Sequence, residues 1–108
     1  MGSGVSLVLD SAALPLLPGA RRLAEQGFLT GGCRRNSTYL EDKVVIARAV
    51  PAGLRDVALD PQTSGGLLLA LPAKAAEKLT RALHKDGIEA ATIVGRATAR
   101  REAWVYLT

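Results

Sequence analysis

Two glycine-containing stretches have the composition of a phosphate-binding loop. One is TGGCRRN, residues 30–36, and the other is DPQTSGG, residues 60–66. Paired glycines let backbone amides approach a ligand closely, and the neighbouring Thr and Ser hydroxyls add donors, a combination that suits a phosphate group. Neither stretch matches the P-loop or the dinucleotide fingerprint. The residue types therefore leave two interpretations open, a phosphate site and a pair of structural turns.

The cysteine and the histidine of the chain offer little further chemistry. Cys33 lies beside Arg34 and Arg35, and nearby cations are expected to lower the pKa of its thiol and permit a nucleophilic role. No histidine base accompanies it, so a small loop residue without chemistry is the favoured interpretation. His84 belongs to the polar face of a helix and is expected on the surface. The sequence thus predicts no catalytic residue and no metal site in this chain.

Length and composition indicate one α/β domain without a nucleic-acid or membrane partner. The chain has 108 residues, of which 48% are hydrophobic, enough for a single core. The net charge of +4 is spread along the sequence and is interpreted as a solvated basic surface, with an anionic partner as the weaker alternative. The four aromatic residues do not cluster with the arginines, which argues against nucleic acid. No apolar run is long enough to cross a bilayer and no leader is evident, so a cytoplasmic protein is expected.

Hydrophobic periodicity predicts helices packed on a mixed sheet, the α/β (α+β) class. The expected strands are 5–10, 43–50, 67–71, 88–94 and 103–107. The expected helices are two turns from Ala20, a short one beginning near Asn36 or Thr38, and the amphipathic stretch 73–86. The segment 67–71 lacks polar alternation and is expected to be buried on both faces. Residues 95–101 are expected to form a basic turn, and residues 1–4 a flexible lead-in or tag remnant.

Four stretches resemble the C-terminal domain of the selenophosphate synthetases (selenide, water dikinases). DPQTSGGLLLALP, residues 60–72, resembles the hallmark segment of that family. The stretches 13–20 (ALPLLPGA), 30–36 (TGGCRRN) and 87–95 agree with it in order and spacing. The resemblance covers nearly the whole chain and implies the C-terminal fold that this family shares with aminoimidazole ribonucleotide synthetase.

The resemblance also implies a function and a set of site residues. The family makes selenophosphate from selenide, water and ATP, with magnesium, and releases AMP and phosphate. The implied nucleotide-binding residues are Gly31, Gly32, Asn36, Asp60, Gln62, Thr63, Ser64, Gly65 and Gly66. Cys33 stands where the family has Thr, which removes a hydroxyl from the first stretch.

The catalytic Cys or selenocysteine, the Lys near it and the metal-binding aspartates of the family have no counterpart in this sequence. The resemblance therefore implies that residues 5–108 form a C-terminal-type domain that lacks its first helix and the N-terminal ATP-binding domain, its expected partner. Alone, the chain is expected to be inactive and to hold neither ATP nor magnesium tightly. An apolar strip left by the missing helix would favour a homo-oligomer. The alternative is a stand-alone, non-catalytic binding or oligomerisation module with the same fold.

Overall fold

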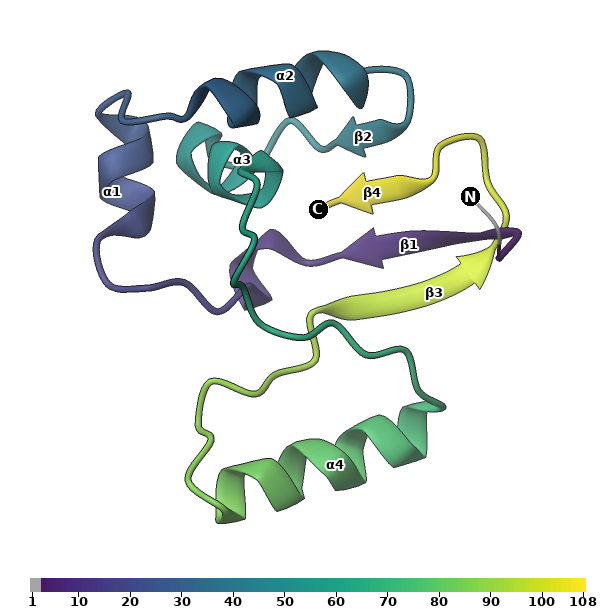
Figure 1. Ribbon diagram of the computed structural model, residues 1–108. Coiled ribbons are helices and arrows are strands. Elements are labelled where there is room, and N and C mark those ends of the chain that lie inside the picture. The colour runs from purple at the N-terminus through teal and green to yellow at the C-terminus, as the bar shows by residue number, and fades with distance from the viewer. Residues whose placement is uncertain (1–2) are drawn as a thin grey trace.

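A mixed four-stranded sheet and four α-helices make up the computed structural model, which describes residues 3–108 (Figure 1). The elements follow the order β1 (Val5–Leu9), the short 3-10 helix η1 (Ser11–Ala13), α1 (Ala20–Glu25), α2 (Gly31–Tyr39), β2 (Val44–Ile46), α3 (Ala52–Leu59), α4 (Ala73–Lys85), β3 (Gly95–Ala99) and β4 (Val105–Leu107). The predicted α/β class, with helices packed on a mixed sheet, is confirmed.

The strand order of the sheet is β2-β4-β1-β3. β4 runs parallel to both of its neighbours, whereas β3 is antiparallel to β1. The register pairs Leu7 with Val105 and Leu9 with Leu107, so apolar side chains from neighbouring strands share one face. Ser6 is fully buried on the opposite face, where its hydroxyl donates to Ala103 O at 2.7 Å and joins β1 to the segment that leads into β4.

Helix α3 packs against both α1 and α2 beside the sheet (Figure 1). Gly53 permits the close approach of α3 to α1. A Cβ atom at this position would lie 2.6 Å from Glu25 Cγ and 2.9 Å from the backbone oxygen of Arg21. Buried apolar side chains come from the helices, from the sheet and from the segment before β4: Val8, Ala24, Cys33, Leu54, Ala103 and Leu107.

Two of the predicted strands, 67–71 and 88–94, are absent from the structure, and β3 lies elsewhere. Residues 67–71 form neither helix nor strand, and Leu67 and Leu68 are 91% and 67% exposed. Residues 88–94 are likewise irregular, whereas β3 occupies most of the predicted basic turn 95–101. The prediction failed because β3 is held by its antiparallel pairing with β1, a long-range interaction that its own polar residues do not signal.

The predicted helix boundaries were correct in some places and wrong in others. α1 and α4 are confirmed, with α4 one residue shorter than predicted. α2 begins at Gly31, well before the predicted start near Asn36 or Thr38, because the Thr30 hydroxyl accepts from the amide of Cys33 and caps the helix. The sequence prediction missed α3 because Pro51 and Gly53 were interpreted as a turn, although a proline is well tolerated where a helix starts. The predicted strand 43–50 shrinks to the three residues of β2.

α4 lies apart from the other elements. It makes at most marginal contacts with any of them, and none of its residues is buried, despite its strongly amphipathic sequence (Figure 1). The structure of residues 3–108 has no helix that combines the length and the hydropathy needed to span a bilayer.

Candidate functional site

The two glycine-containing stretches meet where α2 begins and α3 ends. Thr30 Oγ1 donates to Asp60 Oδ1 at 2.6 Å, and Asn36 Nδ2 donates to Leu59 O at 2.8 Å. Gly32 faces the ring of Pro61, since a Cβ atom at position 32 would lie 2.5 Å from Pro61 Cγ. Of the predicted residues, the structure therefore brings Gly32 and Asn36 of the first stretch against residues 59–61, where Asp60 belongs to the second stretch. Gly31 is the first residue of α2.

The rest of the second stretch extends beyond this junction as an exposed turn. The amide of Gly65 donates to Gln62 O at 3.2 Å, which closes the turn. A Cβ atom at position 66 would have no neighbouring atom within 4 Å. Gln62, Thr63, Ser64, Gly65 and Gly66 thus remain open to solvent, and their predicted contact with a nucleotide stays a prediction.

Thr30 is the residue of this junction that the predicted set left out. Its hydroxyl accepts from the amide of Cys33 at 3.0 Å while it donates to Asp60, so one side chain both caps α2 and holds the second stretch. A Thr directly before a helix is a strong capping signal, and the sequence contained it. The prediction missed it because the paired glycines pointed to a loop.

Electrostatically, the junction places a carboxylate at a helix start. The N-terminal end of α2 carries partial positive charge, and the hydrogen bond from Thr30 holds the Asp60 carboxylate beside it. A phosphate at the same place would gain from the amides of Gly31 and Gly32 but would be repelled by Asp60. The arrangement can therefore accept a phosphate only if a cation offsets the charge of Asp60.

Cys33 points away from this surface and into the contact between α2 and α3. Its side chain is buried, and Sγ donates to Asp56 O at 3.3 Å. Burial raises the pKa of the thiol, the Asp56 and Asp60 carboxylates raise it further, and Arg55 and Arg34 oppose them only in part. The expected lowering by neighbouring cations is thus wrong, and the neutral, buried thiol argues against a nucleophilic role.

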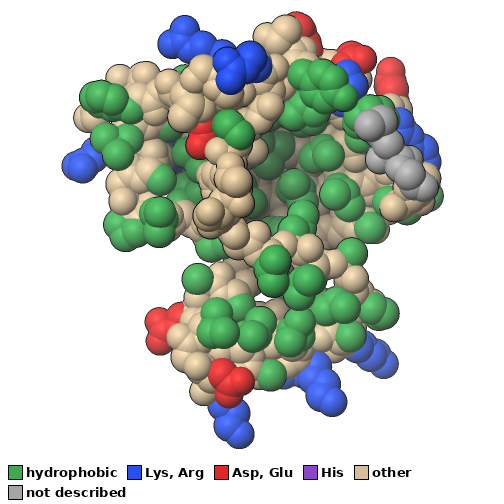
Figure 2. Space-filling model, in the orientation of Figure 1, with side chains coloured by type: hydrophobic (Ala, Val, Ile, Leu, Met, Phe, Trp, Pro, Cys, Tyr) green, Lys and Arg blue, Asp and Glu red, His purple; other side chains and the backbone are tan. Residues whose placement is uncertain are grey.

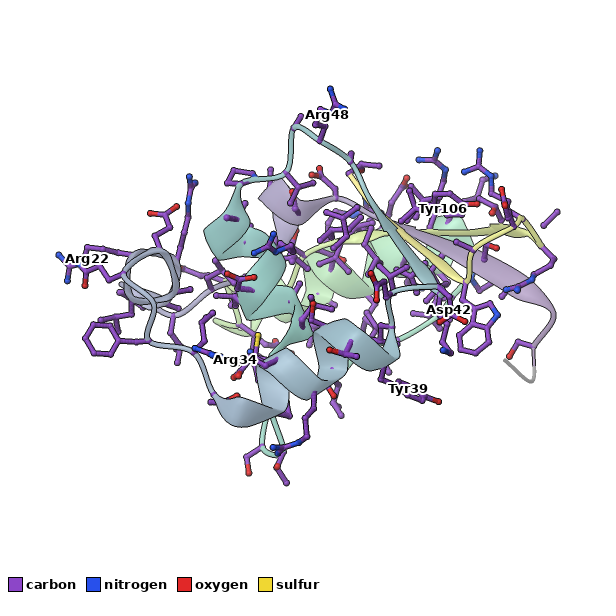
Figure 3. The ribbon with its side chains drawn as sticks, turned by 90° about the horizontal axis from the view of Figure 1, so that it is seen from above. Arg22, Arg34, Tyr39, Asp42, Arg48 and Tyr106 are labelled. Carbon is purple, nitrogen blue, oxygen red and sulfur yellow. The ribbon has the colours of Figure 1, made fainter. Side chains whose placement is uncertain are left out.

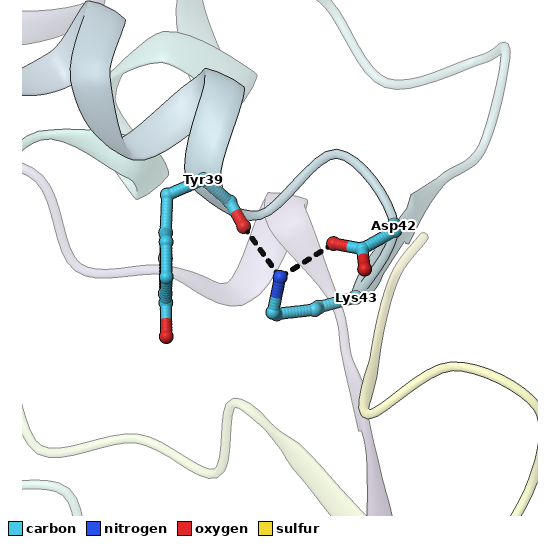
Figure 4. Close-up of polar contacts among 3 residues, drawn as sticks. All are labelled: Tyr39, Asp42 and Lys43. Atoms are coloured by element: carbon cyan, nitrogen blue, oxygen red, sulfur yellow. Dashed lines mark hydrogen bonds and ion pairs between the residues drawn. The ribbon is translucent and has the colours of Figure 1, made fainter.

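Aromatic and cationic side chains gather around Lys43. Two arginines also lie over aromatic rings, Arg100 at 5.9 Å from the ring centre of Trp104 and Arg101 at 4.7 Å from that of Tyr106, so the expectation that the aromatic residues do not cluster with the arginines is wrong. The Lys43 ammonium lies 4.5 Å from the ring centre of Tyr39 and 5.6 Å from that of Trp104. It also donates to Tyr39 O at 2.8 Å and to Asp42, whose pKa it holds below the ordinary value (Figure 4). These contacts connect the end of α2 to the segment before β4, and folding had to bring them together because 60 residues separate Lys43 from Trp104.

The other candidate groups have no partners suited to chemistry. His84 is on the surface as predicted, with its ring nitrogen 2.6 Å from Ala91 O. Arg22 and Arg48 point outward from separate ends of the molecule, consistent with a dispersed basic surface (Figure 3). Throughout residues 3–108, no three His, Cys, Asp or Glu side chains come together in a way that could hold a metal ion.

Comparisons with known proteins support the resemblance seen in the sequence. No protein family model matches the chain. The selenide, water dikinase of Caldanaerobacter subterraneus subsp. tengcongensis is 43% identical over 105 residues, which are 97% of this chain and 30% of that protein. The enzyme of the same name from Agathobacter rectalis is 37% identical over 107 residues, 99% of this chain and 31% of that protein. A third, from Nitratidesulfovibrio vulgaris, is 42% identical over 85 residues, 79% of this chain and 24% of that protein.

The similarity extends along almost all of this chain but only along a part of each relative. The chain spans about 30% of the length of the Caldanaerobacter and Agathobacter proteins. That share fits a C-terminal domain, in agreement with the segments quoted from the sequence. By sequence, the chain is therefore a relative of the selenide, water dikinases, the selenophosphate synthetase family, and corresponds in extent to their C-terminal domain.

Proposed function

We propose that this chain serves as the C-terminal domain of a selenophosphate synthetase-like enzyme, which converts ATP, selenide and water to selenophosphate, AMP and phosphate. The observation that carries the proposal is the junction of residues 30–36 and 60–66. The two stretches that most resemble the family are the ones that lie against each other, through Thr30 with Asp60 and Gly32 with Pro61. The sequence relationship to proteins named selenide, water dikinase supports the same function.

In this proposal the junction forms one wall of a nucleotide cleft. Gly31 and Gly32 offer amides at the start of α2, and the exposed turn 62–66 offers the Thr63 and Ser64 hydroxyls. Bound together with ATP, magnesium supplies positive charge that neutralises phosphate oxygens. The Asp60 carboxylate fits such a charged complex because carboxylate oxygens are preferred magnesium ligands, whereas it would repel a bare phosphate. Asp60 is one carboxylate only, so the remaining magnesium ligands must come from the rest of the enzyme.

The proposed partner is an N-terminal ATP-binding domain that carries the catalytic Cys or selenocysteine and its Lys. This chain alone is then inactive, and its contribution is to close the cleft and exclude water from the phosphates. The setting that this chemistry requires is the cytoplasm, where ATP is available.

A second candidate is a non-catalytic binding or oligomerisation module with the same fold. Its specific support is the exposed apolar segment 67–71 together with α4, which leaves apolar surface available for another protein.

A chimeric enzyme separates the two candidates. In it, this chain replaces the matched 105-residue segment of the Caldanaerobacter protein, and selenide-dependent AMP formation is measured. We expect the chimera to form AMP and this chain alone to form none. A folded chimera in which this chain packs against the rest of the enzyme but no AMP is formed would favour the non-catalytic module. AMP formation by this chain alone would contradict the proposal that catalysis requires the N-terminal domain.

Asp60 supplies the residue-level version of this test. In the chimera, Asp60→Asn keeps the shape of the side chain but removes its charge, so we expect kcat/KM for Mg·ATP to fall at least about tenfold, equivalent to ~1.4 kcal/mol of transition-state stabilisation. Asp86→Asn, at the end of α4, makes the same chemical change far from the junction and should leave kcat/KM unchanged. Equal effects of the two substitutions would remove Asp60 from the nucleotide site.

A further inference from the structure

Basic and aromatic side chains alternate along one strip of the surface, from the first turns of α2 to the segment before β4. The Lys43 ammonium lies between two rings, 4.5 Å from the centre of Tyr39 and 5.6 Å from that of Trp104. The Arg100 guanidinium lies 5.9 Å from the ring centre of Trp104 and continues the alternation. We use the word strip for the following six residues: Arg34, Arg35, Tyr39, Lys43, Trp104 and Arg100.

The α2 end of the strip is hollowed. Arg34, Arg35, Thr38 and Tyr39 line an open hollow of about 480 Å³ on the outer surface of the helix. Residues four apart on a helix lie one above the other, so Arg34 with Thr38 forms one wall and Arg35 with Tyr39 the other. Figure 2 shows Lys and Arg side chains standing over α2. The hollow therefore combines positive charge with an aromatic ring.

The arginines of the strip carry charge that the chain does not neutralise. Arg34, Arg35 and Arg100 are exposed, and within residues 3–108 none of them forms an ion pair. Lys43 differs because it is paired with Asp42, and its side chain is only 19% exposed. Lys43 thus holds the two rings together, while the three arginines remain free to meet an anionic partner.

The two rings of the strip keep surface open to a ligand. Tyr39 is 61% exposed, with Lys43 on one side of its ring (Figure 4), and Trp104 is partly exposed. Exposed aromatic rings beside cations are platforms on which the bases of a single strand stack. An acidic peptide would use the cations and leave the rings without a function. Glu41 and Glu102 adjoin the strip in sequence, which further disfavours a partner held by charge alone.

We propose that the strip binds single-stranded nucleic acid, with phosphates on the three arginines and bases on the rings of Tyr39 and Trp104. Proteins that bind single strands combine these same two components, a basic track for the backbone and aromatic rings for the bases. The expectation of no nucleic-acid partner depended on aromatic residues lying apart from arginines, and the fold brings them together. The proposal does not rest on the selenophosphate synthetase function, because neither Asp60 nor the turn 62–66 belongs to the strip.

Fluorescence anisotropy of labelled oligonucleotides tests the proposed partner. The purified chain is titrated into an oligouridine of about 12 nucleotides and an oligothymidine of the same length, which separate RNA from DNA as the ligand. A duplex and a polyglutamate of similar charge are measured in parallel. We expect saturable binding of at least one single strand, with log K falling against log salt with a slope near −2, about 0.7 for each of three phosphates. No binding of either strand, or equal binding of the duplex or polyglutamate, would overturn the proposal.

Substitutions of exposed aromatic residues test the stacking. Tyr39→Ala should raise the dissociation constant at least about fivefold, the loss expected for one stacked base. Tyr39→Phe keeps the ring and should change it less than twofold. Phe28→Ala is the matched control, because Phe28 is 73% exposed and lies outside the strip, and it should also change the constant less than twofold. Unchanged amide shifts in β1 would show that Tyr39→Ala leaves the sheet intact. Equal effects of Tyr39→Ala and Phe28→Ala would overturn the proposal.

Charge and contact are tested by two further measurements. Arg34→Gln should make the salt slope shallower by about 0.7, whereas Arg22→Gln, at a separate end of the molecule (Figure 3), should leave it unchanged. Trp104 is the only tryptophan of the chain, so its emission reports directly on the strip and should be quenched by the bound strand. Binding without quenching, or the same slope for both arginine variants, would overturn the proposal.

Discussion

At the residue scale, the folded structure controls the chemistry of Cys33 more strongly than its sequence neighbours do. Arg34 and Arg35 adjoin Cys33 in the sequence, but the helix directs the thiol inward, toward the carboxylates of Asp56 and Asp60. A thiolate there would lose hydration and meet negative charge, so the neutral form is favoured. Sequence adjacency predicted the opposite because it gives no information about which side of a helix faces the interior.

Cys33 should therefore make the stability of the protein fall at alkaline pH. Its pKa is raised above the ordinary value of 9.0 in the folded state, so its contribution is complete below that pH and is lost as the pH rises above it. Denaturation curves between pH 7 and pH 10 should show a steeper loss of unfolding free energy for the wild type than for Cys33→Ala. All other titrating groups are the same in the two proteins, so the difference between their curves is due to Cys33. Parallel curves would mean that the thiol is not held in the neutral form.

Asp60 is the residue on which the nucleotide hypothesis depends most directly. Its hydrogen bond with Thr30 explains why the two family-like stretches lie together, which no pattern in either stretch could predict. The hydroxyls of Thr63 and Ser64, by contrast, lie in the exposed turn, and their role depends on what approaches that turn.

At the element scale, close helix packing depends on Gly53. α3 lies against α1 at a distance that leaves no room for a Cβ atom, because the backbone oxygen of Arg21 would be 2.9 Å away. Backbone atoms cannot move aside as a flexible side chain can. The helix pair must therefore separate if residue 53 gains a side chain.

Gly53→Ala should lower the free energy of unfolding by about 1–2 kcal/mol, the strain of overpacking less the gain in helix propensity. Gly66→Ala is the matched control, since no atom lies within 4 Å of its would-be side chain. The control should change the free energy of unfolding by less than about 0.5 kcal/mol. Urea denaturation measures both variants, and an unchanged or more stable Gly53→Ala would contradict the packing of α1 on α3.

The elements differed in how far the sequence predicted them. α4 was predicted almost residue for residue, because its apolar spacing and Gly87 at its end are local signals. β1 was predicted for the same kind of reason, from its alternating Val and Leu residues. β3 was not predicted, because GRATA has little strand character and depends on pairing with β1.

At the scale of the whole molecule, the exposed helix α4 predicts uneven stability. A helix of 13 residues is marginal in water unless its apolar side is covered. In dilute solution the amides of α4 should therefore exchange with solvent at least about tenfold faster than those of β1, which are held in the sheet. Hydrogen exchange followed by NMR measures both sets in one sample. If the amides of α4 are as well protected as those of β1 in dilute solution, α4 is stabilised by contacts within one chain, and an exposed α4 does not describe the chain in solution.

The sequence by itself determined the α/β class, the amphipathic helix 73–85, the first strand and the relationship to the selenide, water dikinases. Each of these depends on local periodicity or on a run of particular residues, which can be recognised without knowing the fold. Only the tertiary structure decided that Thr30 bonds to Asp60, that Cys33 is buried, that Lys43 lies between Tyr39 and Trp104, and that residues 67–71 are exposed and not in a strand. The physical reason is that burial, strand pairing and charge environment depend on residues distant in sequence, so their outcome is set by how the whole chain packs.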